Sequence, residues 1–216
     1  MKKSLLIAFI VLSILIIGCE ELKEKREAKE RKQRKLEYLE TVQKEIQSNT
    51  RNDNIFMDFK LGDSKKQVNN KFSKLLKQKK IFLDDSKSYT YNLILSEDTK
   101  TTAHFSTEFH NGKLYKFVLI INPNKTSLPS RFSLFELMTY LDDIYEKKYG
   151  LCDHLELVDF GGGLNYYWIN GNREISIIQR LNDINVVYLD KIVSSEIKNS
   201  KKQNNKTRLK ETSSDI

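Results

Sequence analysis

Residues 102–122 read TAHFSTEFHNGKLYKFVLIIN, and this stretch sets the architecture of the chain. Two runs of strand-forming residues, 102–110 and 114–122, flank Asn111-Gly112. Asn-Gly between two such runs is the strongest short-range signal of a β-hairpin. Pro123 ends the second run, because proline cannot donate a hydrogen bond to a neighbouring strand. The stretch therefore predicts two antiparallel strands joined by a tight turn.

A helix and a further strand are predicted before this hairpin. Asp63 or Ser64 can cap a helix that extends to about Lys79, because both side chains accept hydrogen bonds from the first helical amides. A strand-like run at 89–95 connects this helix to the hairpin. The first half of the chain thus contains a helix followed by three strands.

The same order of elements occurs again after the hairpin. Ser133 caps a predicted helix from about Leu134 to Tyr149, and Gly150 ends it, as glycine commonly does. Four strand-like runs follow, at 155–160, 164–169, 174–180 and 186–190. A repeated order of elements indicates a tandem organisation even without sequence identity.

Helices followed by hairpins predict an α+β fold, with one antiparallel sheet and the helices on one face. Two tandem repeats, each a helix plus three or four strands, follow a long charged helix in this prediction. The predicted divisions of the chain are a signal peptide at 1–18, an anchor and helical stalk at 19–54, repeats at 55–123 and 124–193, and a disordered basic tail at 194–216.

The predicted stalk consists almost entirely of charged residues in near balance. Residues 20–47 contain no proline or glycine and are rich in Glu, Lys, Arg, Leu and Gln, which favour helix. An apolar stripe occurs only in the second half and covers barely two heptads, whereas a coiled coil needs three or four. The polar segment 48–54 is predicted to be a hinge.

The formal net charge of +8 comes mainly from residues 65–80 and from the tail. Lysines alternate with apolar residues in 65–80, as on an amphipathic helix whose lysines face solvent. This segment contains no arginine, the side chain best suited to phosphates and bases. The pattern therefore favours a soluble helix face, and no nucleic-acid partner is expected.

An export signal is predicted at the start of the sequence. Lys2 and Lys3 precede an apolar run at 5–17, interrupted only by Ser13. This run is shorter than the roughly 20 apolar residues of a membrane-spanning helix. The four residues Ile16-Ile17-Gly18-Cys19 resemble the lipobox of bacterial lipoproteins.

The lipobox resemblance implies cleavage before Cys19 and attachment of a lipid, such as palmitate, to its thiol. At least two acyl chains are then implied, which suffice for stable membrane attachment. Glu20 takes the place of the Asp that favours inner-membrane retention in some bacteria, so an outer membrane or the cell surface is expected. Cys152 then has no intrachain partner and is predicted to be a small, inert, buried side chain.

A second resemblance concerns the globular part. Residues 60–68, KLGDSKKQV, resemble the segment that begins the helix in small lipoproteins of the SmpA/OmlA group. These proteins share a helix-then-sheet unit with the beta-lactamase-inhibitor-protein fold, itself a tandem repeat. The second repeat lacks the Gly-Asp-Ser element, so the resemblance rests on nine residues and on element order.

Aromatic residues suggest a binding face. The runs 114–121 and 166–169 are apolar on both sides, whereas a sheet with helices on one face needs apolar residues on that face alone. The aromatic side chains pack in the core or meet a partner, since interfaces are enriched in aromatics. The candidate binding residues are Tyr115, Phe117, Tyr167, Trp168 and Tyr188.

No catalytic or metal-binding pattern is recognised. His104 and His110 are six residues apart, about 20 Å along a strand, which is too far to share a metal. No cofactor and no metal site are expected. The leading hypothesis is a non-catalytic lipoprotein that binds another envelope or surface protein. Two alternatives remain open: an anchored hydrolase using His104 or Cys152, and adhesion to an acidic polymer.

Overall fold

The predicted hairpin at Asn111-Gly112 is present in the computed structural model. The model describes residues 2–96, 99–122, 134–157 and 163–214, and it describes side chains for residues 25–95, 100–122, 134–157, 163–203 and 205. Strands β3 (Thr99–His110) and β4 (Lys113–Asn122) pair antiparallel, with His110 opposite Lys113. Asn111 and Gly112 have φ values of 48° and 74°, and positive φ at both positions is what a tight two-residue hairpin requires.

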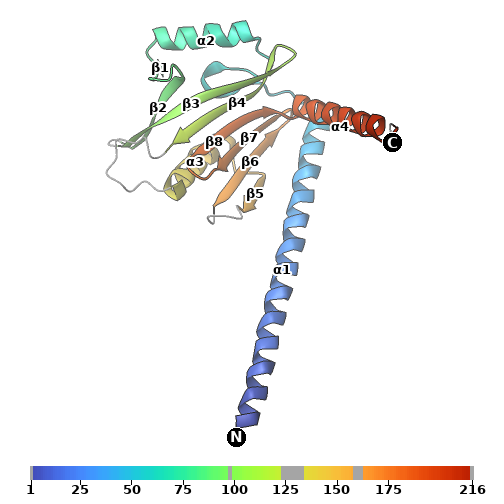
Figure 1. The fold of residues 1–216 in the computed structure, drawn as a ribbon. Helices are drawn as coiled ribbons and strands as arrows, with labels where there is room; N and C mark the ends of the chain where they lie inside the picture. The colour runs from blue at the N-terminus through green and yellow to red at the C-terminus, as the bar shows by residue number, and fades with distance from the viewer. Residues whose placement is uncertain (1, 97–98, 123–133, 158–162, 215–216) are drawn as a thin grey trace. The chain divides into compact units, whose positions relative to one another are not determined.

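The sheet has eight antiparallel strands in the order β1-β2-β3-β4-β8-β7-β6-β5 (Figure 1). Beside β3 and β4, its strands are β1 (Phe82–Leu83), β2 (Tyr89–Ser96), β5 (His154–Leu157), β6 (Leu164–Asn170), β7 (Arg173–Gln179) and β8 (Ile184–Asp190). The last strands of the two halves, β4 and β8, pair at the centre. From this central pair, β4 to β1 follow in order towards one edge of the sheet and β8 to β5 towards the other. This arrangement confirms the predicted tandem α+β fold.

Both repeat helices cover the same face of this sheet. Helix α2 (Lys65–Lys77) contributes Phe72, and α3 (Leu134–Tyr149) contributes Tyr145, to one hydrophobic core. Phe117 and Tyr188 are register partners across β4 and β8, and their rings lie 6.3 Å apart. The core is therefore continuous across the boundary between the repeats.

The predicted helix ends have the expected capping chemistry where the structure describes them. Ser64 caps α2, since its Oγ accepts a hydrogen bond from the Gln67 amide. Gly150 ends α3 with a φ of 85°. The other predicted boundaries, Pro123, Ser133 and strand residues 158–160, lie outside the described residues.

The chain forms two units, Met1–Glu40 and Thr41–Ile216. Helix α1 (Lys2–Gln47) is continuous through the predicted lipobox, and Arg26 pairs with Glu30 on its surface at 3.0 Å. Leu36 and Leu39 are 45% and 49% exposed, whereas Val42, in the second unit, is buried. Among the residues whose side chains are described, which begin at Lys25, no helix is sufficiently long and apolar to cross a membrane.

The polar segment 48–54 is docked on the sheet, so the predicted hinge is wrong. The Asn52 amide donates to Asn172 Oδ1 at 2.7 Å, and the Asn172 side chain donates to Asp53 Oδ1 at 3.0 Å. The Gly171 amide donates to Glu45 Oε2 at 2.8 Å. Asn52 and Asp53 of this segment, together with Glu45 near the end of α1, therefore bind the turn between β6 and β7.

The predicted disordered tail is instead helical, since α4 spans Lys191–Ser214. Asp190 caps its N-terminus, because its Oδ1 accepts hydrogen bonds from the amides of Ile192 and Val193 at 3.0 and 3.1 Å. Residues 191–214 contain no proline or glycine, so no residue of the segment breaks the helix once it has begun.

The 3-10 turn η1 (Phe56–Asp58) lies between the docked segment and α2. Its residues Met57 and Asp58 have positive φ values of 52° and 63°. Left-handed backbone is unfavourable for residues other than glycine, and two in succession require support from their surroundings. Lys71 provides such support, since its Nζ donates to the Asp58 carbonyl oxygen at 2.7 Å.

Candidate functional site

The five candidate aromatic residues do not form one face. Phe117, Trp168 and Tyr188 are 0%, 4% and 1% exposed and lie in the core beneath the helices. The prediction that these three residues form a binding face is wrong, because a partner cannot contact side chains that α2, α3 and the sheet enclose. These three aromatic side chains pack inside the protein, which is the other of the two possibilities that the sequence left open.

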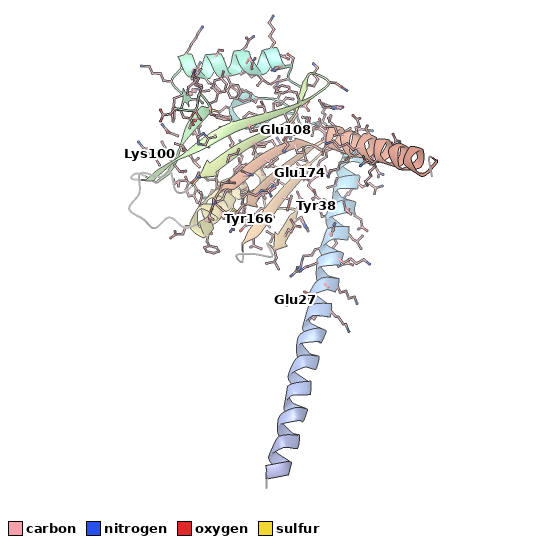
Figure 2. All side chains as sticks on the ribbon, viewed as in Figure 1. Glu27, Tyr38, Lys100, Glu108, Tyr166 and Glu174 are labelled. Carbon is pink, nitrogen blue, oxygen red and sulfur yellow. The ribbon has the colours of Figure 1, made fainter. Side chains whose placement is uncertain are left out.

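Tyr115 and Tyr167 lie apart from this core cluster and each donates to a carboxylate. A bulge opposite Glu108 and Phe109 inserts Tyr115 as an extra residue in β4, and its hydroxyl donates to Glu108 at 2.6 Å (Figure 2, where Glu108 is labelled). This bond is the main reason why the pKa of Tyr115 rises to about 12. The Tyr167 hydroxyl donates to Glu156 at 2.8 Å, three strands away from β4.

The second face of the sheet is shielded at its centre as well. Val118 and Val187 are register partners on β4 and β8, and they are 7% and 8% exposed. Because Cβ directions alternate along a strand, they point away from Phe117 and Tyr188. The two-sided apolar pattern of β4 therefore reflects burial on both faces.

His104 has a carboxylate partner that the sequence did not suggest. Its Nδ1 lies 3.3 Å from Asp84 Oδ2 and 3.2 Å from Thr90 Oγ1. Hydrogen bonds from Ser86, and then from Ser88, lower the pKa of the Asp84 carboxyl. Among the described residues, no hydroxyl or thiol forms a hydrogen bond with the other ring nitrogen, which a Ser-His-Asp arrangement would require.

Cys152 is half-buried, and burial raises the pKa of its thiol, with the charges of Asp142 and Asp153 adding to the effect. A raised pKa favours the neutral thiol, which is the poorer nucleophile. In the parts of the chain whose side chains are described, no group of three His, Cys, Asp or Glu residues is placed to hold a metal ion.

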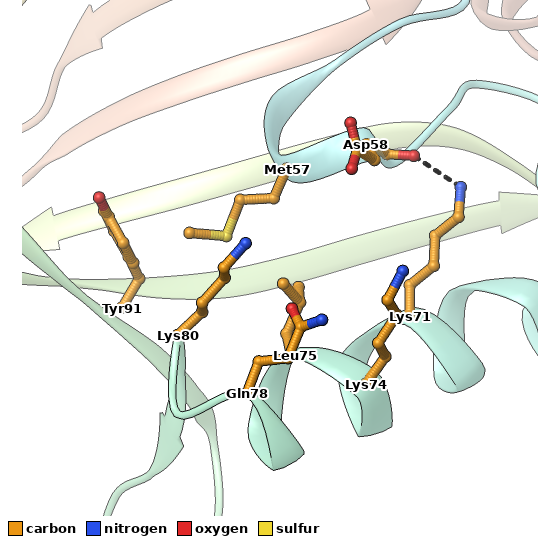
Figure 3. A pocket seen from close by; sticks show the side chains of 8 residues that line it. All are labelled: Met57, Asp58, Lys71, Lys74, Leu75, Gln78, Lys80 and Tyr91. Atoms are coloured by element: carbon orange, nitrogen blue, oxygen red, sulfur yellow. Dashed lines mark hydrogen bonds between the residues drawn. The ribbon is translucent and has the colours of Figure 1, made fainter.

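A concave site lies beside α2 (Figure 3). We call it the α2 cleft; it has a volume of about 490 Å³ and is lined by Met57, Asp58, Lys71, Lys74, Leu75, Gln78, Lys80 and Tyr91. Ligand sites commonly have volumes of about 300–1,000 Å³. The cleft combines the strained turn η1, the second half of α2 and strand β2.

Lysines form one side of the α2 cleft, and apolar side chains form its floor. Figure 3 shows the nitrogen atoms of Lys71, Lys74 and Lys80 directed towards the turn η1. Lys71 is already paired, because its Nζ lies 2.6 Å from Asp63 Oδ2. The ammonium groups of Lys74 and Lys80 form no ion pair with any residue whose side chain is described.

The end of α2 explains the position of Lys80. Lys79 has a φ of 56°, and the amides of Lys79 and Lys80 donate back to the carbonyl oxygens of Leu76 and Leu75. This left-handed turn reverses the chain at the end of the helix. This reversal places Lys80 beside the cleft, whereas a continued helix would carry Lys80 further along the axis of α2.

The sequence predicted solvent-facing lysines in this segment but not the cleft. Lys74 and Lys80 are indeed exposed, whereas the cleft also contains Met57 and Tyr91, which no sequence spacing connects to the lysines. The only signal was the density of lysine between residues 65 and 80.

No protein-family model, no curated protein and no solved structure matches this chain.

Proposed function

We propose that this protein is a lipid-anchored, non-catalytic binding protein of the bacterial cell envelope, and that its α2 cleft binds an acidic segment of another protein. The cleft is the observation that carries the proposal. It offers two ammonium groups that pair with no described carboxylate, a paired third one and an apolar floor within one concave surface. Such a site suits a peptide segment that carries carboxylates beside an apolar side chain.

The anchor is supported by the sequence alone. Lys2 and Lys3, the apolar run at 5–17 and the lipobox-like residues ending at Cys19 occur in the order that lipoprotein export requires. The outer membrane or the cell surface is proposed over the inner membrane, because Glu20 follows the cysteine.

The anchor is tested by feeding a palmitate analogue to cells that express the full chain. Wild type is expected to carry the label and to sediment with membranes, and Cys19→Ala is expected to lose both properties. Cys152→Ala is the matched control and should behave like wild type. Label that persists on Cys19→Ala, or an unlabelled wild type, would contradict the proposal.

Charge complementarity sets the expected partner of the cleft. Lining lysines outnumber the single lining carboxylate, that of Asp58, so a partner gains by presenting acidic groups. Met57 and Leu75 lie between the charges, and a flexible methionine adapts to different apolar side chains. A purely ionic polymer would leave this apolar floor unused, which favours a protein partner.

The test uses a photo-cross-linking amino acid at Gln78, which lines the cleft. We expect a defined cross-linked partner in cells, and weaker capture, by about tenfold, when Lys74→Glu and Lys80→Glu are combined. Reversing two exposed charges corresponds to about 1–2 kcal/mol, or roughly five- to thirtyfold in affinity.

The control combines Lys66→Glu and Lys77→Glu, which change the net charge equally at exposed positions of α2 outside the cleft. This variant should retain the partner. Equal loss in both double variants would instead favour adhesion to an acidic polymer through overall charge. Capture that neither variant weakens would remove the cleft as the binding site.

A further inference from the structure

A second polar pocket, of about 370 Å³, lies between the docked segment, the end of α3 and the start of β7. Its lining includes Asn52, Asn54, Lys148, Tyr149 and Arg173. No lining residue is shared with the α2 cleft. The two sites therefore have no binding group in common, and the inference below goes beyond the function proposed above.

Arg173 is the unusual member of this pocket. The residue is only 6% exposed, and its guanidinium lies 5.3 Å from the centre of the Tyr149 ring. Its Nη1 donates to the carbonyl oxygen of Asn54, whereas its buried Nε has no hydrogen-bond partner among the described residues. No carboxylate among the described residues lies within ion-pair distance of it.

The nearby carboxylates are already engaged by other donors. Asp190 accepts a hydrogen bond from Asn172 at 3.2 Å and lies 3.6 Å from Arg51. Asp53 accepts from Asn172 and pairs with Arg51 at 2.9 Å. Burial lowers the pKa of Arg173, and neighbouring tyrosines, not carboxylates, are the groups that oppose this effect.

A buried charge is costly unless it is paired. The planar guanidinium has five donors, and its fork matches a carboxylate or a phosphate group. Lys148 adds a second positive charge to the same pocket, and its Nζ lies 5.1 Å from the centre of the Tyr149 ring. The pocket lining contains both cations and the Asn52 and Asn54 amides but no carboxylate.

We infer that this pocket is an oxyanion site, which binds a small molecule through a carboxylate or phosphate group held by Arg173 and Lys148. The pocket volume falls within the range of small-molecule sites. The bound group supplies the counter-charge that the chain itself does not place beside Arg173. The asparagine amides then serve as hydrogen-bonding groups for the remainder of the ligand.

The experiment is a calorimetric titration of the full chain, in detergent, with sodium acetate and with inorganic phosphate at constant ionic strength set by chloride. Saturable binding of either anion is expected, and the preferred anion identifies which group the pocket takes. Arg173→Met should weaken binding at least tenfold, and Lys148→Gln severalfold. The matched control, Lys147→Gln, removes another exposed charge from the same helix outside the pocket and should bind like wild type.

If Arg173→Met does not fold, the comparison of Lys148→Gln with Lys147→Gln decides alone. Equal weakening by these two substitutions would show a diffuse charge effect and overturn the inference. Absence of saturable binding of both anions to wild type would also overturn it.

Discussion

Replacing Asn172 with alanine is expected to destabilise the protein strongly. Asn172 is 1% exposed, and its side chain accepts one hydrogen bond, from the Asn52 amide, and donates two, to Asp53 and Asp190. A hydrogen bond contributes about 1 kcal/mol to stability, and one to a charged group about 1.5–3 kcal/mol. Losing all three predicts a decrease in the free energy of unfolding of about 4–7 kcal/mol.

Denaturant unfolding of the full chain measures this loss, and site-resolved hydrogen exchange locates it. In the variant, the Asn52 amide has lost its acceptor and should exchange much faster. Asn182→Ala, in the exposed turn between β7 and β8, is the matched control and should unfold like wild type. A loss below about 1 kcal/mol, together with unchanged exchange at Asn52, would refute the reasoning.

Three further substitutions or titrations follow from single contacts. Gly171→Ala should destabilise by at least about 2 kcal/mol, since φ is +59° there and a Cβ would lie 2.1 Å from the Thr50 carbonyl oxygen; a neutral result in denaturant unfolding would contradict this. Alkylation of Cys152 should become fast only at a higher pH than for a free cysteine, because burial raises its pKa; alkylation at the pH of a free cysteine would count against it. The hydrogen bond from Lys116 lowers the pKa of Glu108 in the folded protein. The ionised Glu108 therefore stabilises the fold at any pH above its unfolded-state pKa, and this stabilisation is lost as the pH falls through its folded-state pKa. Thermal unfolding measured against pH should show that Glu108→Gln loses less stability on acidification than wild type.

Local signals in the sequence predicted the local structure well. Asn111-Gly112, the Ser64 cap and Gly150 each act within a few residues, so their chemistry can be recognised without the rest of the fold. The helix-then-strands order also predicted the fold class. The central pairing of β4 with β8 could not be predicted, because register partners such as Phe117 and Tyr188 are distant in sequence.

The wrong predictions share a physical cause, which is that the decisive partners are remote. The segment 48–54 reads as a hinge until Asn172, 120 residues after Asn52, provides its acceptor. The composition of the tail suggests disorder, but the tail forms helix α4, and Asp190 caps the start of this helix. Tyr115 and Phe117 were grouped by residue type, yet the bulge in β4 turns Tyr115 to Glu108.

The segment from Asn52 to Asp58 borders both proposed sites, and this explains why its backbone is so firmly held. Asn52 and Asn54 line the oxyanion pocket, whereas Met57 lines the α2 cleft. A mobile segment would remove a wall from each site. A ligand that binds the protein only when this segment is docked stabilises the docked state through its binding free energy. Because residues of the docked segment line both sites, a substitution that undocks the segment should weaken binding at each of them.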